Sequence, residues 1–370
     1  DGVYTSITDA VGHTPLVALP FLSRLTGCRL FGKCEFLNPG GSSKDRVALG
    51  LVLEAERRGR IRPHAGHTLV EGTVGSTGIA LAMVARARGY RCVIVMPDDV
   101  SRDKSMLLRK LGADVRLVRP APIVHPNHFV NVARQLAEDA NAAALKRRHA
   151  APSPSLGEAA VAADHVLANC DDAWFFVDQF ENTSNFAIHR DTTAVEIHRQ
   201  LRGQRLDVLV MGAGTGGTLA GLTHYLKPRR PELRVCLADP QGSGLFNKVV
   251  HGVMYSPYEA EGTRRRHQSD TVVEGMGLTR LTANFEQLMR PCPPLPAPQH
   301  AAASITDQEA VTMARLLVQR EGLFLGSTSA VNVMAAVRQA LHGPPGAVIV
   351  TILCDAGQRY LGRFWDDDYL

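Results

Sequence analysis

A lysine stands at the end of a tight polar turn, in the run Asn38-Pro39-Gly40-Gly41-Ser42-Ser43-Lys44. Pro39 fixes φ, the glycines permit positive φ, and either serine can accept from the free N–H groups of a following helix. The residues from Val47 to Gly59 predict that helix. The turn therefore places a primary amine at a helix start, where it could form an imine with an aldehyde. A lysine on a capped helix is more often only solvated, so the case for chemistry rests on its partners.

Two further loops, rich in glycine and hydroxyl residues, are candidate partners of Lys44. Thr73 to Gly78 and Gly212 to Thr218 each follow a predicted strand and open a predicted helix. Backbone N–H groups at a helix N-terminus bind anions such as phosphate. A third hydroxyl cluster lies at 327–329. One aldehyde cofactor that carries one phosphate would use the lysine and all three clusters.

The second loop also permits a different reading. Gly212 to Gly217 matches G-x-G-x-x-G between a strand and a helix, and Asp239 ends the next predicted strand at roughly the spacing of a ribose-binding acid. An NAD-dependent oxidoreductase is therefore an alternative. It leaves the lysine turn and the other clusters unexplained.

The rest of the chain alternates predicted strands with predicted helices, which is typical of parallel α/β folds. Strands are expected near 29–35, 68–71, 91–97, 114–118, 174–177, 206–211, 234–238 and 347–354. The section 241–299 gives few elements. The Ala-, Pro- and charge-rich segment 120–172 predicts a largely exposed insertion that carries one helix at 127–144. The length of 370 residues fits two domains.

Composition excludes several classes of function. The net charge of +5 is small, and the basic runs at 146–149 and 264–267 lack interleaved aromatic residues, so we expect no nucleic-acid surface. No apolar run approaches the ~20 residues of a membrane span. The histidine pairs at 64/67 and 125/128 lack further ligands, and we expect no metal. Seven scattered cysteines favour a reducing compartment, cytoplasmic or mitochondrial, and any leader or anchor upstream of Asp1 is not visible.

In order and in type, these motifs resemble those of cysteine synthases, which are pyridoxal-phosphate enzymes of the tryptophan-synthase β fold. The matching segments are N-P-G-G-S-S-K-D-R from Asn38, T-V-G-S-T-G from Thr73, Gln179 to Asn182, Ile188-His189, Thr192-Thr193 and G-T-G-G-T from Gly214. The ending Cys354 to Leu361 and the pair Glu274-Gly275 are similar to cystathionine β-synthase. The resemblance covers nearly the whole chain except about 120–172.

The resemblance implies two doubly wound, mostly parallel-sheet domains with the cofactor in the cleft between them. We expect a larger domain of 1–40 and 181–370, and a smaller, mobile domain of 41–180. The resemblance also implies a homodimer.

The resemblance further implies that Lys44 holds pyridoxal 5'-phosphate as an imine. Ser76 and Gly214 are also expected to bind the cofactor. The residues expected to bind its phosphate are Thr215, Gly216, Gly217 and Thr218. Those expected at the substrate are Thr73, Val74, Gly75, Ser76, Thr77, Gln179 and Gly275. Thr328 would meet the ring nitrogen as a neutral hydroxyl donor, which makes the ring a weaker electron sink than a carboxylate partner would.

The implied reaction makes L-cysteine from an O-activated serine, O-acetylserine above all, and sulfide. Two residues depart from the family pattern T-S-G-N-T-G: Val74 replaces the serine, and Ser76 replaces the asparagine beside the cofactor's ring hydroxyl. Substrate choice is therefore open. A cystathionine β-synthase-like or cysteine-desulfhydrase-like reaction and a regulatory protein with weak turnover remain alternatives.

Replacement of the lysine tests the first inference. We expect Lys44→Ala to be colourless or to hold the cofactor only loosely, because the covalent attachment is lost. Visible absorption of the purified protein measures this. Full colour and full turnover in Lys44→Ala would contradict the role of Lys44.

Overall fold

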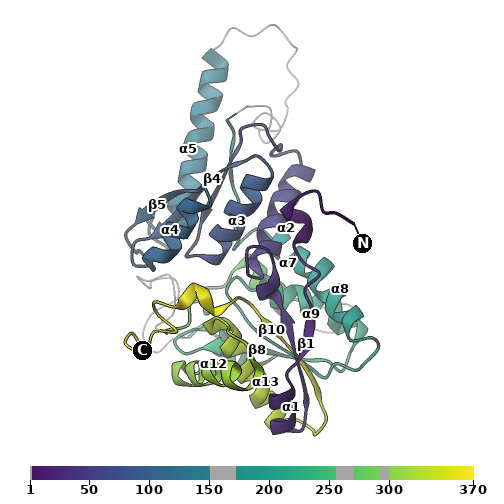
Figure 1. Ribbon diagram of the computed structural model, residues 1–370. Coiled ribbons are helices and arrows are strands. Elements are labelled where there is room, and N and C mark those ends of the chain that lie inside the picture. The colour runs from purple at the N-terminus through teal and green to yellow at the C-terminus, as the bar shows by residue number, and fades with distance from the viewer. Residues whose placement is uncertain (1, 151–171, 256–270, 292–299) are drawn as a thin grey trace.

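The computed structural model describes residues 2–150, 172–255, 271–291 and 300–370. Two sheets, each covered by helices, lie one above the other in Figure 1. The larger sheet has the strand order β1-β2-β10-β7-β8-β9, and the smaller has the order β5-β4-β3-β6. Apart from the antiparallel pair β1 and β2, all these strands pair in parallel. The expected α/β class with mostly parallel sheets is confirmed.

The larger sheet carries helices on both faces. Its strands are β1 (Leu16–Ala18), β2 (Arg29–Cys34), β7 (Val208–Gly212), β8 (Arg234–Pro240), β9 (Ala301–Ile305) and β10 (Val348–Leu353). One core cluster joins it to α1 (Pro20–Thr26), α12 (Asp307–Glu321) and α13 (Ser327–His342). A second cluster joins it to α8 (Ala194–Gln200), α9 (Gly217–Arg229), α10 (Leu245–His251) and α11 (Ala283–Met289). This sheet is therefore doubly wound.

The smaller sheet is also covered on both faces. Its strands are β3 (Thr68–Gly72), β4 (Arg91–Pro97), β5 (Asp114–Val118) and β6 (Trp174–Phe176). Helices α2 (Lys44–Arg57), α3 (Ser76–Ala87) and α4 (Arg102–Lys110) contribute to the core on one face, and α5 (Phe129–Ala150) packs on the other. Helix α7 (Ser184–Ile188) and a π-helical turn (His189–Thr193) lead from β6 to α8. Short 3-10 turns lie at Ile7–Ala10, Glu35–Leu37 and Gly357–Tyr360.

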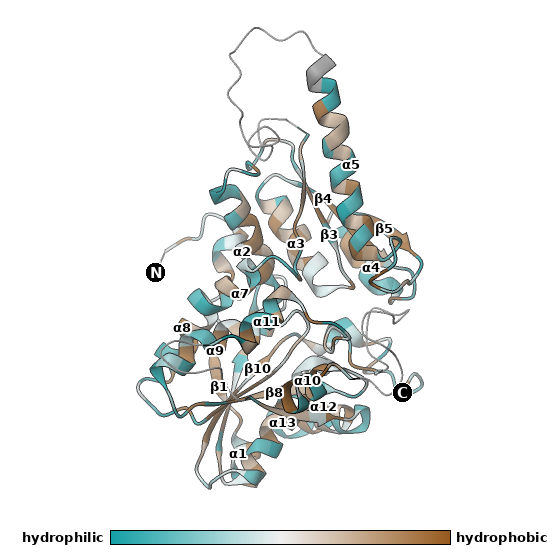
Figure 2. Ribbon diagram, turned by 180° about the vertical axis from the view of Figure 1, so that it is seen from behind, coloured by the Kyte–Doolittle hydropathy of each residue, from teal (hydrophilic) through white to brown (hydrophobic). Residues whose placement is uncertain are grey.

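Local sequence explains why these elements form. All six residues of β10 are apolar or threonine and all are buried, as expected for a central parallel strand. Figure 2 shows the strands of both sheets mainly in the brown of apolar residues. Helix α12 begins with a capping box between Thr306 and Glu309 and ends at Gly322 in the left-handed conformation.

The structure contains elements that the sequence did not predict. Helices α1, α10 and α11 are short, with seven residues each, and β9 is rich in alanine. Short helices carry too few turns to show a period, and alanine is depleted in strands. The three helices nonetheless pack on the larger sheet, and β9 forms its edge strand.

The prediction that 120–172 is largely exposed is wrong for its helix. The first half of α5 contributes Phe129, Val130, Ala133 and Ala137 to a buried cluster with β3 and β4. Gly72 of β3 lies so close to the backbone of Phe129 and Val130 that a Cβ there would clash. Alanines that looked like loop composition therefore form a close helix–sheet contact. Residues 151–171, where the exposed loop was expected, lie outside the described residues.

Paired substitutions on α5 test this contact. Ala137 is buried and Ala142 is exposed on the same helix. We expect Ala137→Asp to lower the free energy of unfolding by ~3 kcal/mol or more, because it buries a carboxylate without a partner. Ala142→Asp should change it by less than about 0.5 kcal/mol. Denaturant titration measures both, and equal effects would show that α5 does not pack on the sheet.

Candidate functional site

The loop before Lys44 is held by hydrogen bonds at both ends. The Gly40 N–H donates to Asp45 Oδ2 at 2.5 Å, and Gly41 has a φ of 81°. The Ser43 N–H donates to the carbonyl of Cys354 at 3.1 Å, which ties the loop to the end of β10. Helix α2 then begins at Lys44 itself, three residues earlier than predicted. The lysine is thereby fixed at the carboxyl end of the central strand.

A buried ion network fixes the first turn of α2. Arg46 donates to Glu35 at 2.8 and 2.9 Å and to Glu196 at 2.7 and 2.8 Å. Lys33 Nζ lies 2.6 Å from Glu196, and its side chain is fully buried. Burial alone would raise the pKa of Glu196, but Arg46 and Lys33 hold it at about 2. Both carboxylates therefore stay charged and anchor the helix that carries Lys44.

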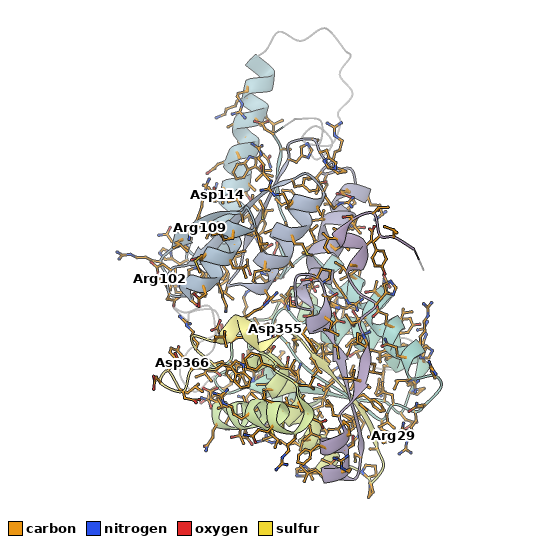
Figure 3. All side chains as sticks on the ribbon, viewed as in Figure 1. Arg29, Arg102, Arg109, Asp114, Asp355 and Asp366 are labelled. Carbon is orange, nitrogen blue, oxygen red and sulfur yellow. The ribbon has the colours of Figure 1, made fainter. Side chains whose placement is uncertain are left out.

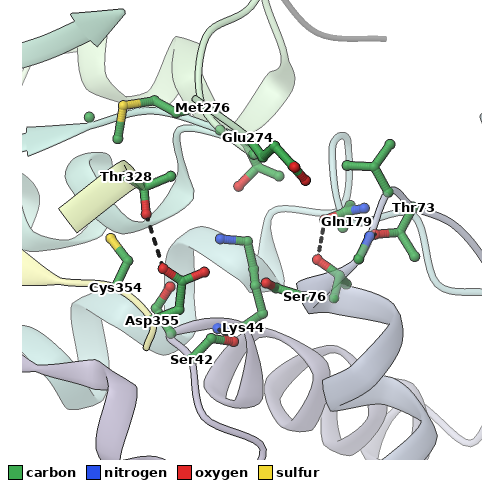
Figure 4. Close-up of a pocket in the computed structure, with 18 of the residues that line it drawn as sticks. Ser42, Lys44, Thr73, Ser76, Gln179, Glu274, Met276, Thr328, Cys354 and Asp355 are labelled. Carbon is green, nitrogen blue, oxygen red and sulfur yellow. Dashed lines mark hydrogen bonds between the residues drawn. The ribbon is translucent and has the colours of Figure 1, made fainter. Parts of the chain in front are cut away.

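Lys44 lines a pocket between the two sheets with about 980 Å³ of space, part of it open to solvent. Figure 4 shows its amine pointing into this space. Opposite lies the start of α3, where Gly75 is the N-cap and no described side chain caps the first turn. Thr77 donates to Gln179 Oε1 at 2.6 Å, and Gln179 Nε2 donates to the carbonyl of Gly72 at 3.2 Å. This helix start is suited to a carboxylate.

A second open helix start lies at α9. Its N-cap Gly216 is left-handed, and no described side chain caps it. A Cβ on Gly216 or Gly217 would clash with Phe285 or Asn185, so only glycine fits. Thr215 Oγ1 accepts from Asn185 Nδ2 at 2.8 Å, and Thr218 Oγ1 lies 3.0 Å from His189 Nε2. Burial lowers the pKa of His189 to about 3, so its imidazole is neutral and orients Thr218 without adding charge.

The pocket wall beyond Lys44 comes from α13 and the end of β10. Thr328, in the first turn of α13, donates to Asp355 Oδ1 at 3.4 Å. Tyr360 donates its hydroxyl proton to Asp355 Oδ2. Cys354 also lines the pocket, and burial raises the pKa of its thiol to about 12. Figure 3 shows Asp355 at the level where the two halves of the molecule meet.

An ion pair crosses the pocket between the two halves. Lys104 of α4 contacts Glu274 of the loop before α11, and both side chains are buried. Lys104 also lies over the ring of Tyr360, 5.0 Å from its centroid. Burial lowers the pKa of Lys104 to about 8, whereas contact with Glu274 favours the ammonium form. Arg363 adds a second link across the halves by donating to the carbonyl of Asp99 at 2.8 Å.

The structure gathers most of the predicted site residues. Those that line the pocket are Lys44, Thr73, Val74, Gly75, Ser76, Thr77, Gln179, Gly214, Thr215, Gly275 and Thr328. The chain continues from Thr215 into α9 through three predicted residues that do not line the pocket, Gly216, Gly217 and Thr218. Sequence reasoning missed Lys104, Glu274, Asp355 and Tyr360 as pocket residues. Asp355 could have been predicted as a pocket residue, because it follows a buried parallel strand, and ligands of α/β sheets bind at the carboxyl ends of such strands.

The position of Asp239 argues against the NAD-dependent alternative. Asp239 is fully buried, and its Oδ2 accepts from the Phe246 N–H at 2.7 Å, which fixes the start of α10. Burial raises its pKa to about 7. Asp239 therefore cannot meet a ribose at the surface of the glycine loop.

An amine between two open helix starts fits a phosphate-bearing aldehyde that must also meet an amino acid. The family model described as pyridoxal-phosphate dependent enzyme matches residues 7–355. The chain belongs to this family. Its cofactor is pyridoxal phosphate.

Known proteins of this family are similar over nearly the whole chain. Cysteine synthase 2 of Neurospora crassa is 51% identical over 365 residues, covering 97% of this chain and 72% of that protein. Cysteine synthase 2 of Schizosaccharomyces pombe is 45% identical, covering 100% of this chain and 86% of its own. The crystal structure of an O-acetylserine dependent cystathionine β-synthase from Helicobacter pylori superposes with a TM-score of 0.73 at 29% identity, covering 98% and 99% of the two chains. Within the described residues, no helix is long and apolar enough to cross a membrane.

A double-mutant cycle tests the ion pair across the pocket. We expect Lys104→Met and Glu274→Met each to lower the free energy of unfolding by about 3–5 kcal/mol, because each leaves a buried charge without its partner. The double variant should lose much less than the sum. Asp367→Asn, which breaks the exposed pair with Arg315, is the control and should cost less than about 1 kcal/mol. Additive losses in the cycle would mean that Lys104 and Glu274 do not act as a pair.

Proposed function

We propose that this protein makes L-cysteine from an O-activated serine and sulfide, with O-acetylserine as the first donor to test. One observation carries the proposal: Lys44 lines one pocket with the start of α3 and with Gly214 and Thr215, which lead into the start of α9, and no described side chain caps either helix start. A pyridoxal-phosphate enzyme of amino acids needs one anion site for its cofactor and another for the substrate carboxylate. The names of the relatives in Neurospora crassa and Schizosaccharomyces pombe support cysteine as the product.

The two helix starts would bind different anionic groups. Thr215, Thr218 and the first N–H groups of α9 would hold the phosphate, with His189 and Asn185 orienting the two hydroxyls. The first N–H groups of α3, together with Thr73 and Gln179, would hold the substrate carboxylate. Buried Glu71 supports this second site, because its Oε2 accepts from the Gln179 N–H at 3.3 Å. Val74 leaves this site dependent mainly on backbone donors.

Lys44 would remove the proton from the Cα of the substrate and later return it. When bound, pyridoxal phosphate supplies an electron sink that stabilises negative charge at the Cα of the amino acid. The Nζ of Lys44, freed when the substrate amine takes its place, would remove the Cα proton. The oxygen substituent would leave Cβ with its bonding electrons, hydrosulfide would bond to the same carbon, and Lys44 Nζ would return the proton to Cα.

Closer contact between the two halves around a bound substrate would keep water from the pocket. The Lys104–Glu274 pair already joins the halves at the pocket wall, and the bond from Arg363 to the carbonyl of Asp99 joins them outside the lining residues. Exclusion of water strengthens the charge interactions at the helix starts. It also favours hydrosulfide over water at Cβ.

A donor screen tests the proposal. Purified holoenzyme is mixed with sulfide and, in turn, O-acetylserine, O-phosphoserine, serine or cysteine, and L-cysteine or released sulfide is measured. We expect L-cysteine from at least one O-activated serine. Product formed only when an amino-acid thiol replaces sulfide would favour a cystathionine synthase. No turnover with any donor would favour the regulatory alternative.

Further features of the protein are part of the same proposal. We propose a homodimer, a larger domain of 1–40 and 181–370, and a smaller domain of 41–180 that moves against it. We also propose a reducing compartment, cytoplasmic or mitochondrial. All five cysteines in the described residues, Cys28, Cys34, Cys92, Cys236 and Cys354, are free and buried, which supports it.

Ser76 is expected to tune the choice of donor. Its hydroxyl accepts from Arg359 at 3.1 Å, so it is oriented from the larger half of the molecule. We expect Ser76→Asn to change the ratio of kcat/KM between donors while the unfolding midpoint stays nearly constant, because an amide would reach further toward the cofactor's ring hydroxyl. Steady-state kinetics with each donor measures this. If the ratios of kcat/KM between donors are unchanged, Ser76 does not contact the reacting substrate.

A further inference from the structure

A second pocket lies at the other end of the smaller sheet. It offers about 800 Å³ of space, part of it open to solvent, and no described residue lines both this pocket and that of Lys44. All four strands of the sheet contribute the residue with which they begin: Thr68, Arg91, Asp114 and Trp174. Figure 3 shows Asp114 in the smaller half and Asp355 where the two halves meet.

Strand β3 separates the two pockets. Its first residue, Thr68, lines the second pocket, and Thr73, which follows its last residue, lines the pocket of Lys44. Because a strand rises by ~3.3 Å per residue, the five residues of β3 place the pockets about 15 Å apart. A molecule in the second pocket would therefore bind alongside the substrate of Lys44 and would not compete with it.

Much of the wall of the second pocket is apolar. Helix α3 contributes Ala82 and Ala85, and the strands contribute Cys92, Val93 and Trp174. Small-molecule pockets are mostly apolar, with a few polar groups that fix the orientation of the ligand. This wall can accept the apolar part of a small molecule.

The charged residues of this pocket are three arginines and one aspartate. Arg116 pairs with Asp114 at 3.3 Å. No described residue forms a hydrogen bond or an ion pair with the side chain of Arg86 or of Arg91. Two guanidinium groups at one pocket are therefore available to an anion.

The guanidinium group of Arg86 is placed by the backbone beside it. Arg86 belongs to the last turn of α3, and Gly112 follows α4 with a φ of 87°. A Cβ on Gly112 would clash with Arg86 Nη2, so only glycine leaves room for the guanidinium group. Arg86 thus lies over the turn between α4 and β5.

A hydroxyl group in the wall also lacks a partner. Thr68 is 1% exposed, and its Oγ1 forms no hydrogen bond with any described group. Buried hydroxyl groups are usually paired, because an unpaired one costs free energy. Thr68 pairs in the sheet with Arg91 on one side and Trp174 on the other. An unused hydrogen-bonding group therefore lies in the strand next to an unused cation.

We propose that this pocket binds a small organic anion, with its carboxylate or phosphate group on Arg86 and Arg91 and its apolar part against α3 and Trp174. Guanidinium groups bind both kinds of anion by paired, charge-assisted hydrogen bonds. Binding here does not depend on the proposed function, because the pocket of Lys44 is separate. The anion would contact the end of α3, the helix whose first residue, Ser76, lines the pocket of Lys44.

Fluorine NMR can detect binding in this pocket directly. The chain has two tryptophans, Trp174 in the pocket and Trp365, which packs against Phe324 and Phe364 in the larger half. The holoenzyme is labelled with fluorotryptophan, and Trp365→Phe assigns the two ¹⁹F resonances. We expect phenyl phosphate and benzoate to shift the Trp174 resonance until it saturates at millimolar concentration. Benzyl alcohol, which is uncharged, should not shift it.

Substitutions of single residues test the contacts. Arg86→Ala and Arg91→Ala should each weaken the binding of phenyl phosphate by about tenfold, because each removes a charge-assisted contact. Thr68→Val, which removes the unpaired hydroxyl, should weaken it by a smaller factor. Arg109→Ala is the matched control, since Arg109 is an exposed arginine of α4 that does not line the pocket, and it should leave the affinity unchanged.

Three results would overturn the proposal: no shift of the Trp174 resonance with either anion, an equal shift with benzyl alcohol, or equal weakening by Arg109→Ala and Arg86→Ala. Tighter binding of phenyl phosphate would support a phosphate ester as the ligand, and tighter binding of benzoate a carboxylate. Because the readout needs no turnover, failure of the donor screen would leave this result interpretable.

Discussion

The guanidinium of Arg46 is the contact on which the site depends. It bridges Glu35, just after β2, and Glu196 of α8, while it belongs to the first turn of the helix that begins at Lys44. Burying three charged groups is costly unless each is paired, and Lys33 completes the pairing in this network. Arg46 thus holds the start of α2 on the larger sheet, although the body of α2 packs with the smaller one.

This arrangement would let the two halves close around the pocket while the amine of Lys44 stays fixed to the larger sheet. Lys44 and the start of α9 are both anchored to the larger sheet, whereas the start of α3 belongs to the smaller. The contacts that join the halves at the pocket, Lys104 with Glu274 and Arg359 with Ser76, involve long side chains that can separate. Motion of the smaller half would therefore move the start of α3 toward or away from Lys44.

The sequence predicted the parts of the site that depend on local backbone chemistry. The lysine turn and the two glycine loops could be found because glycine and hydroxyl residues before a helix have a direct structural meaning. Most long strands and helices could be found because their apolar spacing is regular, whereas α10 and α11 are too short for a period. The first half of α5 was mistaken for an exposed insertion, because alanine composition does not reveal how closely Gly72 approaches.

The contacts between polar residues across the pocket could not be predicted from the sequence for another reason. Lys104 and Glu274 are 170 residues apart, and Asp355 meets Thr328 only through the register of β10 beside α13. Charged residues are usually solvated, so nothing in their local sequence marks Lys104 and Glu274 as buried.

Identification of the lysine that carries the cofactor tests the central claim most directly. The holoenzyme is reduced with borohydride, digested, and its peptides are examined by mass spectrometry for the mass of a reduced pyridoxal-phosphate adduct. We predict the adduct on the peptide that contains Lys44, and none on the peptides of Lys33 or Lys104, which are the buried lysines among the described residues. An adduct on Lys104, or on any lysine other than Lys44, would contradict the assignment of Lys44 as the amine that binds the cofactor in this pocket.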